Sequence, residues 1–138
     1  MGMRTFEATA SCIDGTNVAY CSEGSKFVLG SKVTDDPAFD MCPVDLLMAA
    51  MAGCVAMTIR TLARVQKIEM TDLAVTARGE RSDGAKTRAL EKVIMTVSLS
   101  SSAPKQVIDE LVAEAEKTCT VCSTVRCTPA FETRVCLK

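Results

Sequence analysis

The sequence predicts an α+β fold in which strands and helices occupy separate stretches of the chain. Three observations carry this prediction: alternating residues near the N-terminus, a long apolar stretch without proline, and a later pair of alternating segments. An amphipathic helix and a final strand follow them. The resulting order of strands, helix, two strands, helix and strand is typical of antiparallel sheets packed against helices.

The N-terminal third of the chain has the alternation of short strands. One face of the first strand carries the residues Phe6, Ala8, Ala10 and Cys12, and the other face is polar. A turn at residues 14–17 precedes strands near 18–21 and 26–30. The polar residues 31–42 are expected to form a loop.

A long helix is expected from Val44 to about Gln66, with Pro43 at its first position, where proline is favoured. Asp45 then lies close to the positive end of the helix dipole. The first half, residues 46–57, is apolar on all faces, and such a helix is normally buried on all faces. A chain of 138 residues has difficulty covering it alone, so we expect a second copy of the chain, that is, a homodimer.

Two strands with apolar residues at 73–77 and 93–99 follow, and the turn at 82–85 joins them as a hairpin. Pro104 opens an amphipathic helix that extends to about Lys117. These segments share the alternation or the helical spacing that packing on a common core requires.

The C-terminal residues are expected to form a short helical segment near 119–125 and a closing strand. One face of that strand carries Phe131, Thr133, Val135 and Leu137. No repeat or linker interrupts the sequence, and a chain of this length suits one domain, so we expect a single domain over residues 1–138.

The charge balance argues against several classes of partner. Lys and Arg total 16 and Asp and Glu total 17, which gives no basic surface for nucleic acid or an anionic membrane. The N-terminus lacks the apolar region of a secretory signal. No uninterrupted apolar run reaches the roughly 18 residues of a membrane span. We therefore expect a cytoplasmic protein with no nucleic-acid or membrane partner.

Eight cysteines and no histidine set the available chemistry. In a reducing compartment so many cysteines indicate buried small hydrophobic residues, a metal site or redox chemistry. The absence of histidine removes the nucleophile pairs and zinc sites that depend on imidazole. Thiolates, carboxylates, arginines, lysines and the backbone remain.

Cys119 and Cys122 form a C-x-x-C pair, in which one thiol can resolve the oxidised form of the other. Two alternatives stay open: two half-buried packing thiols, or a zinc site. A tetrathiolate zinc site usually has two close pairs, which Cys127 and Cys136 do not supply, so we expect no metal and no cofactor. Packing is the simpler interpretation for the cysteines at 12, 21, 42, 127 and 136.

Two stretches resemble motifs of the OsmC/Ohr family of thiol-dependent hydroperoxide reductases. The first, from Pro43 to Cys54, is similar to P-x-E-L-L-x-A-A-x-x-x-C, with Asp45 at the glutamate position. The second, from Ala115 to Ser123, is similar to A-x-x-x-C-P-V-S, with Thr120 in place of proline and Cys122 in place of serine. The order of strands and helices agrees over almost the whole chain.

The resemblance implies an OsmC-like fold, an intertwined homodimer and a peroxidase active in oxidative-stress defence. It implies that Cys54 is the thiolate that attacks the peroxide and that Cys119 resolves the resulting sulfenic acid as a disulfide. An external dithiol would then reduce this disulfide. We include Asp45 and Cys122 among the candidate catalytic residues.

The sequence also departs from the family pattern. Val44 stands where peroxidases of the family carry the glutamate that holds an N-terminal arginine, and Arg4 is the single arginine before Cys54. Asp45 with a cation at position 26, 32, 60 or 126 is a possible substitute. Two other functions remain as alternatives: a non-catalytic dimeric module that binds a small apolar ligand or a partner, and another thiol chemistry that uses Cys119 and Cys122.

Overall fold

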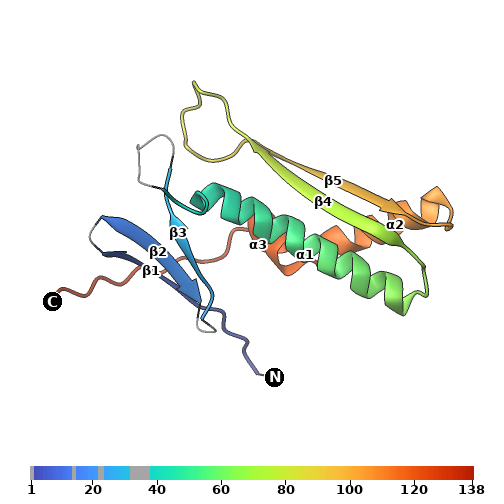
Figure 1. Ribbon diagram of the computed structural model, residues 1–138, viewed down its shortest axis with the longest axis horizontal. Helices are drawn as coiled ribbons and strands as arrows, with labels where there is room; N and C mark the ends of the chain where they lie inside the picture. Colours follow the sequence, from blue (N-terminus) through green and yellow to red (C-terminus); the bar gives the residue numbers. More distant parts are fainter. Residues whose placement is uncertain (1, 14, 22–23, 32–37) are drawn as a thin grey trace. The chain divides into compact units, whose positions relative to one another are not determined.

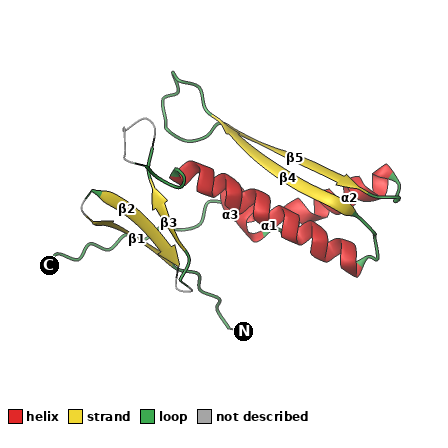
Figure 2. Cartoon of the chain, in the orientation of Figure 1, coloured by secondary structure: helices red, strands yellow, loops and turns green. Residues whose placement is uncertain are grey.

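The computed structural model describes residues 2–13, 15–21, 24–31 and 38–138. Its elements are β1 (Ala8–Ile13), β2 (Thr16–Cys21), β3 (Lys26–Leu29), α1 (Pro43–Val65), β4 (Thr71–Glu80), β5 (Lys92–Ser100), α2 (Lys105–Thr118) and α3 (Thr120–Arg126). Strands and helices alternate in blocks, which confirms the α+β class (Figures 1 and 2).

The chain divides into two compact units, Met1–Leu47 and Met48–Lys138. The expectation of a single domain over residues 1–138 stays a prediction.

The first unit contains an antiparallel sheet with the strand order β1-β2-β3. β2 begins at Thr16, two residues earlier than the alternation indicates, and pairs Val18 with Val28 of β3. Asp40 makes two hydrogen bonds with Val28 of β3. Its carboxylate accepts from the Val28 N–H at 2.7 Å, and its own N–H donates to the Val28 carbonyl at 2.9 Å. Residue 14 of the expected turn and residues 32–37 of the expected loop lie outside the described residues.

α1 begins and ends within one residue of the bounds that its composition predicts. Its buried residues, Met51, Val55, Ile59 and Ala63, recur every four positions and so form one stripe along the helix. The described residues of the second unit do not cover the remaining apolar faces; Met57, for example, is 65% exposed. The helix is therefore apolar on more faces than a single copy buries.

α1 also meets the length and composition criteria for a membrane-spanning helix, with a mean hydropathy of 1.7. A search for an uninterrupted apolar run does not find this helix, because the membrane-span criterion, unlike that search, tolerates a few charged residues. Core helices of soluble proteins pass the same test, and α1 contributes a stripe of four residues to a core.

The second unit has its core between the β4-β5 hairpin and the helices. Figure 1 shows the two strands extending side by side along α1. The strands pair Val75 with Val97 and Ala77 with Met95, which places these residues on the face that packs against the core. The fully or nearly buried residues of this core are Met51, Val55, Ile59, Ala63, Leu111, Ala115, Cys119 and Cys122. Two of the candidate catalytic cysteines are therefore core residues.

The expected closing strand is wrong. Residues 128–138 belong to no helix or sheet of the described chain, and the apolar side chains face solvent. Phe131 is 85%, Val135 81% and Leu137 95% exposed. Alternation shows only that a segment suits a strand; a strand must also pair with a neighbour, and this segment pairs with none of the described strands.

Candidate redox site

Cys54 lies near the middle of α1, beside the buried stripe of that helix, and its side chain is half-buried. Its side chain packs against the core that contains Cys119, and the Cys119 side chain and the backbone of Val121 and Thr120 lie near enough to shift the pKa of its thiol. Residues from two regions of the sequence thus meet at one sulfur. The structure brings together the two cysteines that the family resemblance pairs.

Cys119 occupies the junction between α2 and α3. Its N–H donates to the Ala115 carbonyl at 2.9 Å, which completes the last turn of α2. Its sulfur accepts from the Cys122 N–H at 3.5 Å and so caps the first turn of α3. The side chain is 1% exposed. The last turn of α2 and the first turn of α3 therefore fix the position of Cys119.

Burial raises the pKa of the Cys54 thiol above its ordinary value of 9.0, and this is the largest effect on it. The hydrogen bond to Cys119 and the charge of that group raise the pKa further. The N–H groups of Val121 and Thr120 act in the opposite direction, because they donate to the thiolate. Among the described residues, no cation contributes to the shift.

Cys122 lies one helical turn after Cys119 and is 2% exposed. Both members of the C-x-x-C pair are thus buried, while Cys54 retains some exposure. Of the three thiols, Cys54 is therefore the most accessible to solvent.

Asp45 lies in the first turn of α1, as its position in the sequence predicts. Its carboxylate accepts a hydrogen bond from the Cys42 thiol at 3.1 Å, and its N–H donates to the Cys42 sulfur at 3.5 Å. This reciprocal arrangement resembles a capping box, with a thiol in place of a hydroxyl. A catalytic role for Asp45 stays a prediction.

The cations considered as substitutes for the missing arginine have different surroundings. Arg126 forms an ion pair with Glu116 at 3.6 Å. Arg60 lines a hollow on the surface of the second unit. Lys26 is exposed at the start of β3, and Lys32 lies outside the described residues.

Packing was the expectation for the remaining cysteines, and it is wrong for most of them. Cys12, Cys21, Cys127 and Cys136 are exposed, and Cys42 is half-buried. The first two lie on strands of the small N-terminal sheet, and the last two follow α3, where no core is within reach of the described segment. No group of three or more possible metal ligands occurs among the described residues.

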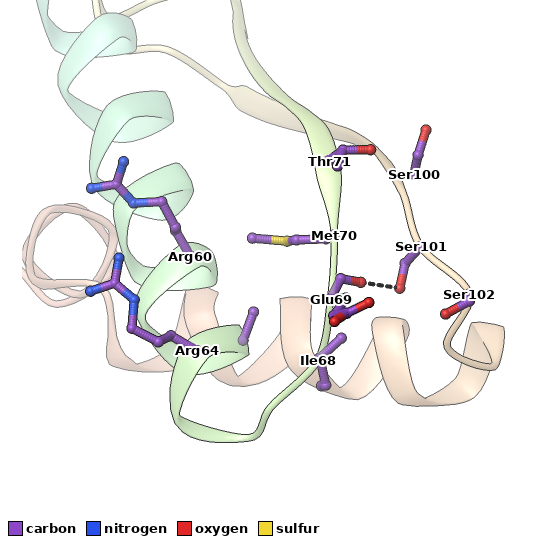
Figure 3. A pocket seen from close by; sticks show the side chains of 10 residues that line it. Arg60, Arg64, Ile68, Glu69, Met70, Thr71, Ser100, Ser101 and Ser102 are labelled. Atoms are coloured by element: carbon purple, nitrogen blue, oxygen red, sulfur yellow. Dashed lines mark hydrogen bonds between the residues drawn. The ribbon is translucent and has the colours of Figure 1, made fainter.

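A hollow of about 800 Å³ on the second unit does not include these thiols. Arg60 and Arg64 of α1 form one side of it, and Ser100, Ser101 and Ser102 lie on the other (Figure 3). The Ser101 hydroxyl donates to the Glu69 carbonyl at 2.6 Å. The lining is mixed, because Ala63, Ile68 and Met70 contribute apolar surface beside these charged and hydroxyl groups.

Sequence reasoning missed two parts of the site region. The amide donors at Cys54 are backbone N–H groups, which every residue except proline carries. No residue type in the sequence therefore indicates their position. The Cys42 cap was missed because serine, threonine, aspartate and asparagine are the usual capping residues.

Comparison with known proteins agrees with this architecture. A model of the OsmC-like protein family matches residues 34–134. The OsmC-like protein from Mycoplasma pneumoniae is similar in structure, with a TM-score of 0.79 and 19% identity over 91% of this chain and 89% of that chain. No curated protein matches the sequence.

Two further solved structures are named for hydroperoxide resistance. The OsmC protein of Legionella pneumophila gives a TM-score of 0.66 with 21% identity over 91% of this chain and 92% of that chain. The OhrB protein of Bacillus subtilis gives 0.60 with 17% identity over 91% and 93%. At these identities the likeness establishes the fold. Together with the family match, it shows that this chain belongs to the OsmC-like family.

Proposed function

We propose that the protein reduces organic hydroperoxides with Cys54 and Cys119 as its redox pair. The observation that carries the proposal is that these two side chains, which come from α1 and from the α2–α3 junction, lie together in one core and that Cys119 shifts the pKa of Cys54. Two thiols this close can form a disulfide with little rearrangement.

The chemistry requires only groups that are present at the site and a peroxide. The Cys54 thiolate attacks one peroxide oxygen, the O–O bond breaks, and the alkoxide takes a proton to leave as an alcohol. Cys54 is then a sulfenic acid. The Cys119 sulfur attacks it, water leaves, and a disulfide forms. An external dithiol returns both sulfurs to the thiol state.

The electrostatics of the site predict how this reaction depends on pH. The raised pKa of Cys54 leaves less thiolate at neutral pH than an exposed cysteine has. The N–H groups of Val121 and Thr120 stabilise what thiolate forms. We therefore expect hydroperoxide consumption to be slow at pH 7 and to rise through pH 9.

The relatives support the substrate class by name only. The Legionella pneumophila and Bacillus subtilis proteins are described as organic hydroperoxide resistance proteins. This agrees with a role for the present protein in oxidative-stress defence as an antioxidant enzyme. Because its thiols need a reducing compartment, we expect it to act in the cytoplasm.

The test is consumption of cumene hydroperoxide by the reduced protein, followed by peptide mapping. Cys54→Ser should abolish consumption. Cys119→Ser should consume the first equivalent and leave Cys54 as a sulfenic acid that dimedone labels. Cys127→Ser, which removes an exposed cysteine, is the matched control and should behave as the unaltered protein. Consumption that survives in Cys54→Ser would refute the proposal.

We also propose that the working form is a homodimer that covers the open face of α1. Gly53 lies in the middle of this helix, where glycine costs roughly 0.5–1 kcal/mol relative to alanine. A Cβ built at Gly53 meets no atom of the described chain within 4 Å, so the chain itself gives no reason for glycine there. Close approach of a helix from a second copy would supply the reason, and the exposed Met57 lies one turn further along.

A further inference from the structure

We propose that Cys122 is a third thiol of the same reaction: it receives the disulfide from the Cys54–Cys119 pair and returns Cys54 to the reduced state. This inference rests on the proposed function and extends it by one thiol–disulfide exchange. The stretch around Cys119 resembles a motif with serine at position 122, so the third thiol is a feature of this chain rather than of that motif.

The local backbone places Cys122 against Cys119. Cys119 caps α3, and Cys122 is the third residue of that helix. Helical side chains tilt toward the N-terminus, so a side chain at this position faces the cap. The Cys122 nitrogen lies 3.5 Å from the Cys119 sulfur. One N–Cα bond further, the Cys122 Cα lies at most about 5 Å from that sulfur.

Residues three apart in a helix have Cβ atoms about 5–6 Å apart. A disulfide needs Cβ atoms about 3.5–4.5 Å apart, so a Cys119–Cys122 bond requires only a small local shift. Cys119 therefore has two thiol neighbours: Cys54, which packs against the same core from α1, and Cys122, which follows it in α3. A sulfur between two thiols can exchange one disulfide partner for the other.

The burial of the three residues gives the exchange a direction. Cys54 is half-buried, whereas Cys119 is 1% and Cys122 2% exposed. A peroxide therefore meets Cys54 first. Transfer of the oxidised state to the buried pair removes it from solvent and frees the accessible thiol for another encounter.

The step balances without any added reagent. Cys122 loses its proton, and its thiolate attacks the Cys119 sulfur of the Cys54–Cys119 disulfide. The bond between Cys54 and Cys119 breaks, and its electron pair leaves with Cys54 as a thiolate. The N–H groups of Val121 and Thr120, which bond to the Cys54 sulfur, receive this charge. The product is a Cys119–Cys122 disulfide.

The inference has a consequence that can be counted. Without reductant, one hydroperoxide yields the Cys119–Cys122 disulfide and a reduced Cys54. A second hydroperoxide then converts Cys54 to a sulfenic acid that has no free resolving thiol. The unaltered protein should thus consume about two equivalents per chain, and Cys122→Ser about one, a twofold difference.

The experiment titrates fully reduced protein with cumene hydroperoxide and maps the products at successive times. Cys127→Ser is the matched control, because it removes an exposed thiol at the other end of the same helix, and should retain the twofold higher capacity. In the unaltered protein, the Cys54–Cys119 disulfide should form first and decay into Cys119–Cys122. Dimedone should then label Cys54 after the second equivalent, and should not label it in Cys122→Ser.

Failure of the inference and failure of the proposed function give different results. Equal capacities of about one equivalent, with a Cys54–Cys119 disulfide that persists, overturn the exchange and leave the peroxidase proposal intact. A Cys119–Cys122 bond that forms equally fast in Cys54→Ser overturns both. If hydroperoxide is not consumed, the proposed function fails, and diamide decides the exchange: decay of Cys54–Cys119 into Cys119–Cys122 supports it, and any other course overturns it.

Discussion

Leu111 connects the stability of the second unit to the position of the candidate site. It lies on α2, is 1% exposed, and belongs to the core that also contains Val55 and Ile59 of α1. Two turns later the same helix ends at Cys119. Replacement of Leu111 by alanine therefore tests the packing that holds the end of α2, and Cys119 with it, against α1.

The size of the effect follows from the burial. The substitution removes three carbon atoms, worth about 0.8 kcal/mol each in transfer from water, or about 2.4 kcal/mol together. A residual cavity adds to this, because Val55 and Ile59 are β-branched, fixed in a helix and unable to close the space. Leucine-to-alanine changes at buried sites cost about 2.7–5 kcal/mol, so we expect about 3.5 kcal/mol here.

The assay is chemical denaturation followed by circular dichroism at a fixed protein concentration, since assembly shifts apparent stability. The same change should lower the thermal midpoint by about 10 °C. Val65→Ala is the control: Val65 is 74% exposed at the end of α1, and its truncation should change stability by less than about 0.5 kcal/mol.

A loss below about 1 kcal/mol for Leu111→Ala, or one equal to that of the control, would refute the reasoning. It would mean that α2 does not pack on α1 as described. A large loss of stability together with slower formation of the Cys54–Cys119 disulfide would show that this packing also sets the distance between the thiols.

Three further predictions concern the thiols and the assembly. Alkylation of Cys54, followed by peptide mapping, should keep accelerating above pH 9.0, because the Cys54 thiol in the folded chain holds its proton more tightly than an exposed cysteine does. Cys119→Ala removes two of the effects that raise the pKa of Cys54 and should speed alkylation at pH 8. An unchanged or slower rate would contradict this. Light scattering should give about twice the 14.7 kDa chain mass. Gly53→Leu should reduce the measured mass to that of one chain, whereas Val65→Leu should leave the dimer intact. A dimer that tolerates Gly53→Leu contradicts the proposed interface. Elemental analysis should give less than about 0.1 zinc per chain, and a stoichiometric value would return the cysteine pair to the role of metal ligands.

The secondary structure could be predicted from the sequence where local chemistry decides it. α1 was placed to within one residue, because its composition favours helix and Pro43 marks its first turn. The β4–β5 hairpin was predicted from alternation on a single buried face. In both cases the deciding information lies within about 25 residues of sequence.

The closing strand shows where that information ends. Phe131, Val135 and Leu137 alternate as strand residues do, but the segment has no partner within the described chain. Strand pairing depends on which backbone groups are free elsewhere, and sequence pattern does not record this. The same limit applies to α1: its apolar residues predict burial, yet they do not say whether this chain or a second copy provides it.

For the candidate site, spacing alone indicated the Cys119–Cys122 pair but could not connect Cys54 to it. That connection came from the resemblance of two motifs, and the structure places the side chains of Cys54 and Cys119 in the same core. The raised pKa of Cys54 depends on burial and on neighbours from α3, so it is a property of the tertiary structure.

The burial of the three thiols also predicts the route of reduction. If oxidising equivalents reach Cys119 and Cys122 through Cys54, a reductant must take the same path, because the two buried sulfurs offer almost no surface to an external dithiol. Cys54 would attack the Cys119–Cys122 disulfide from within, and the reductant would then act on the more exposed Cys54–Cys119 bond. Reduction of a preformed Cys119–Cys122 disulfide by dithiothreitol should therefore be at least about tenfold slower in Cys54→Ser than in the unaltered protein. Equal rates would mean that the reductant reaches the buried pair directly and that Cys54 is not the gate to it.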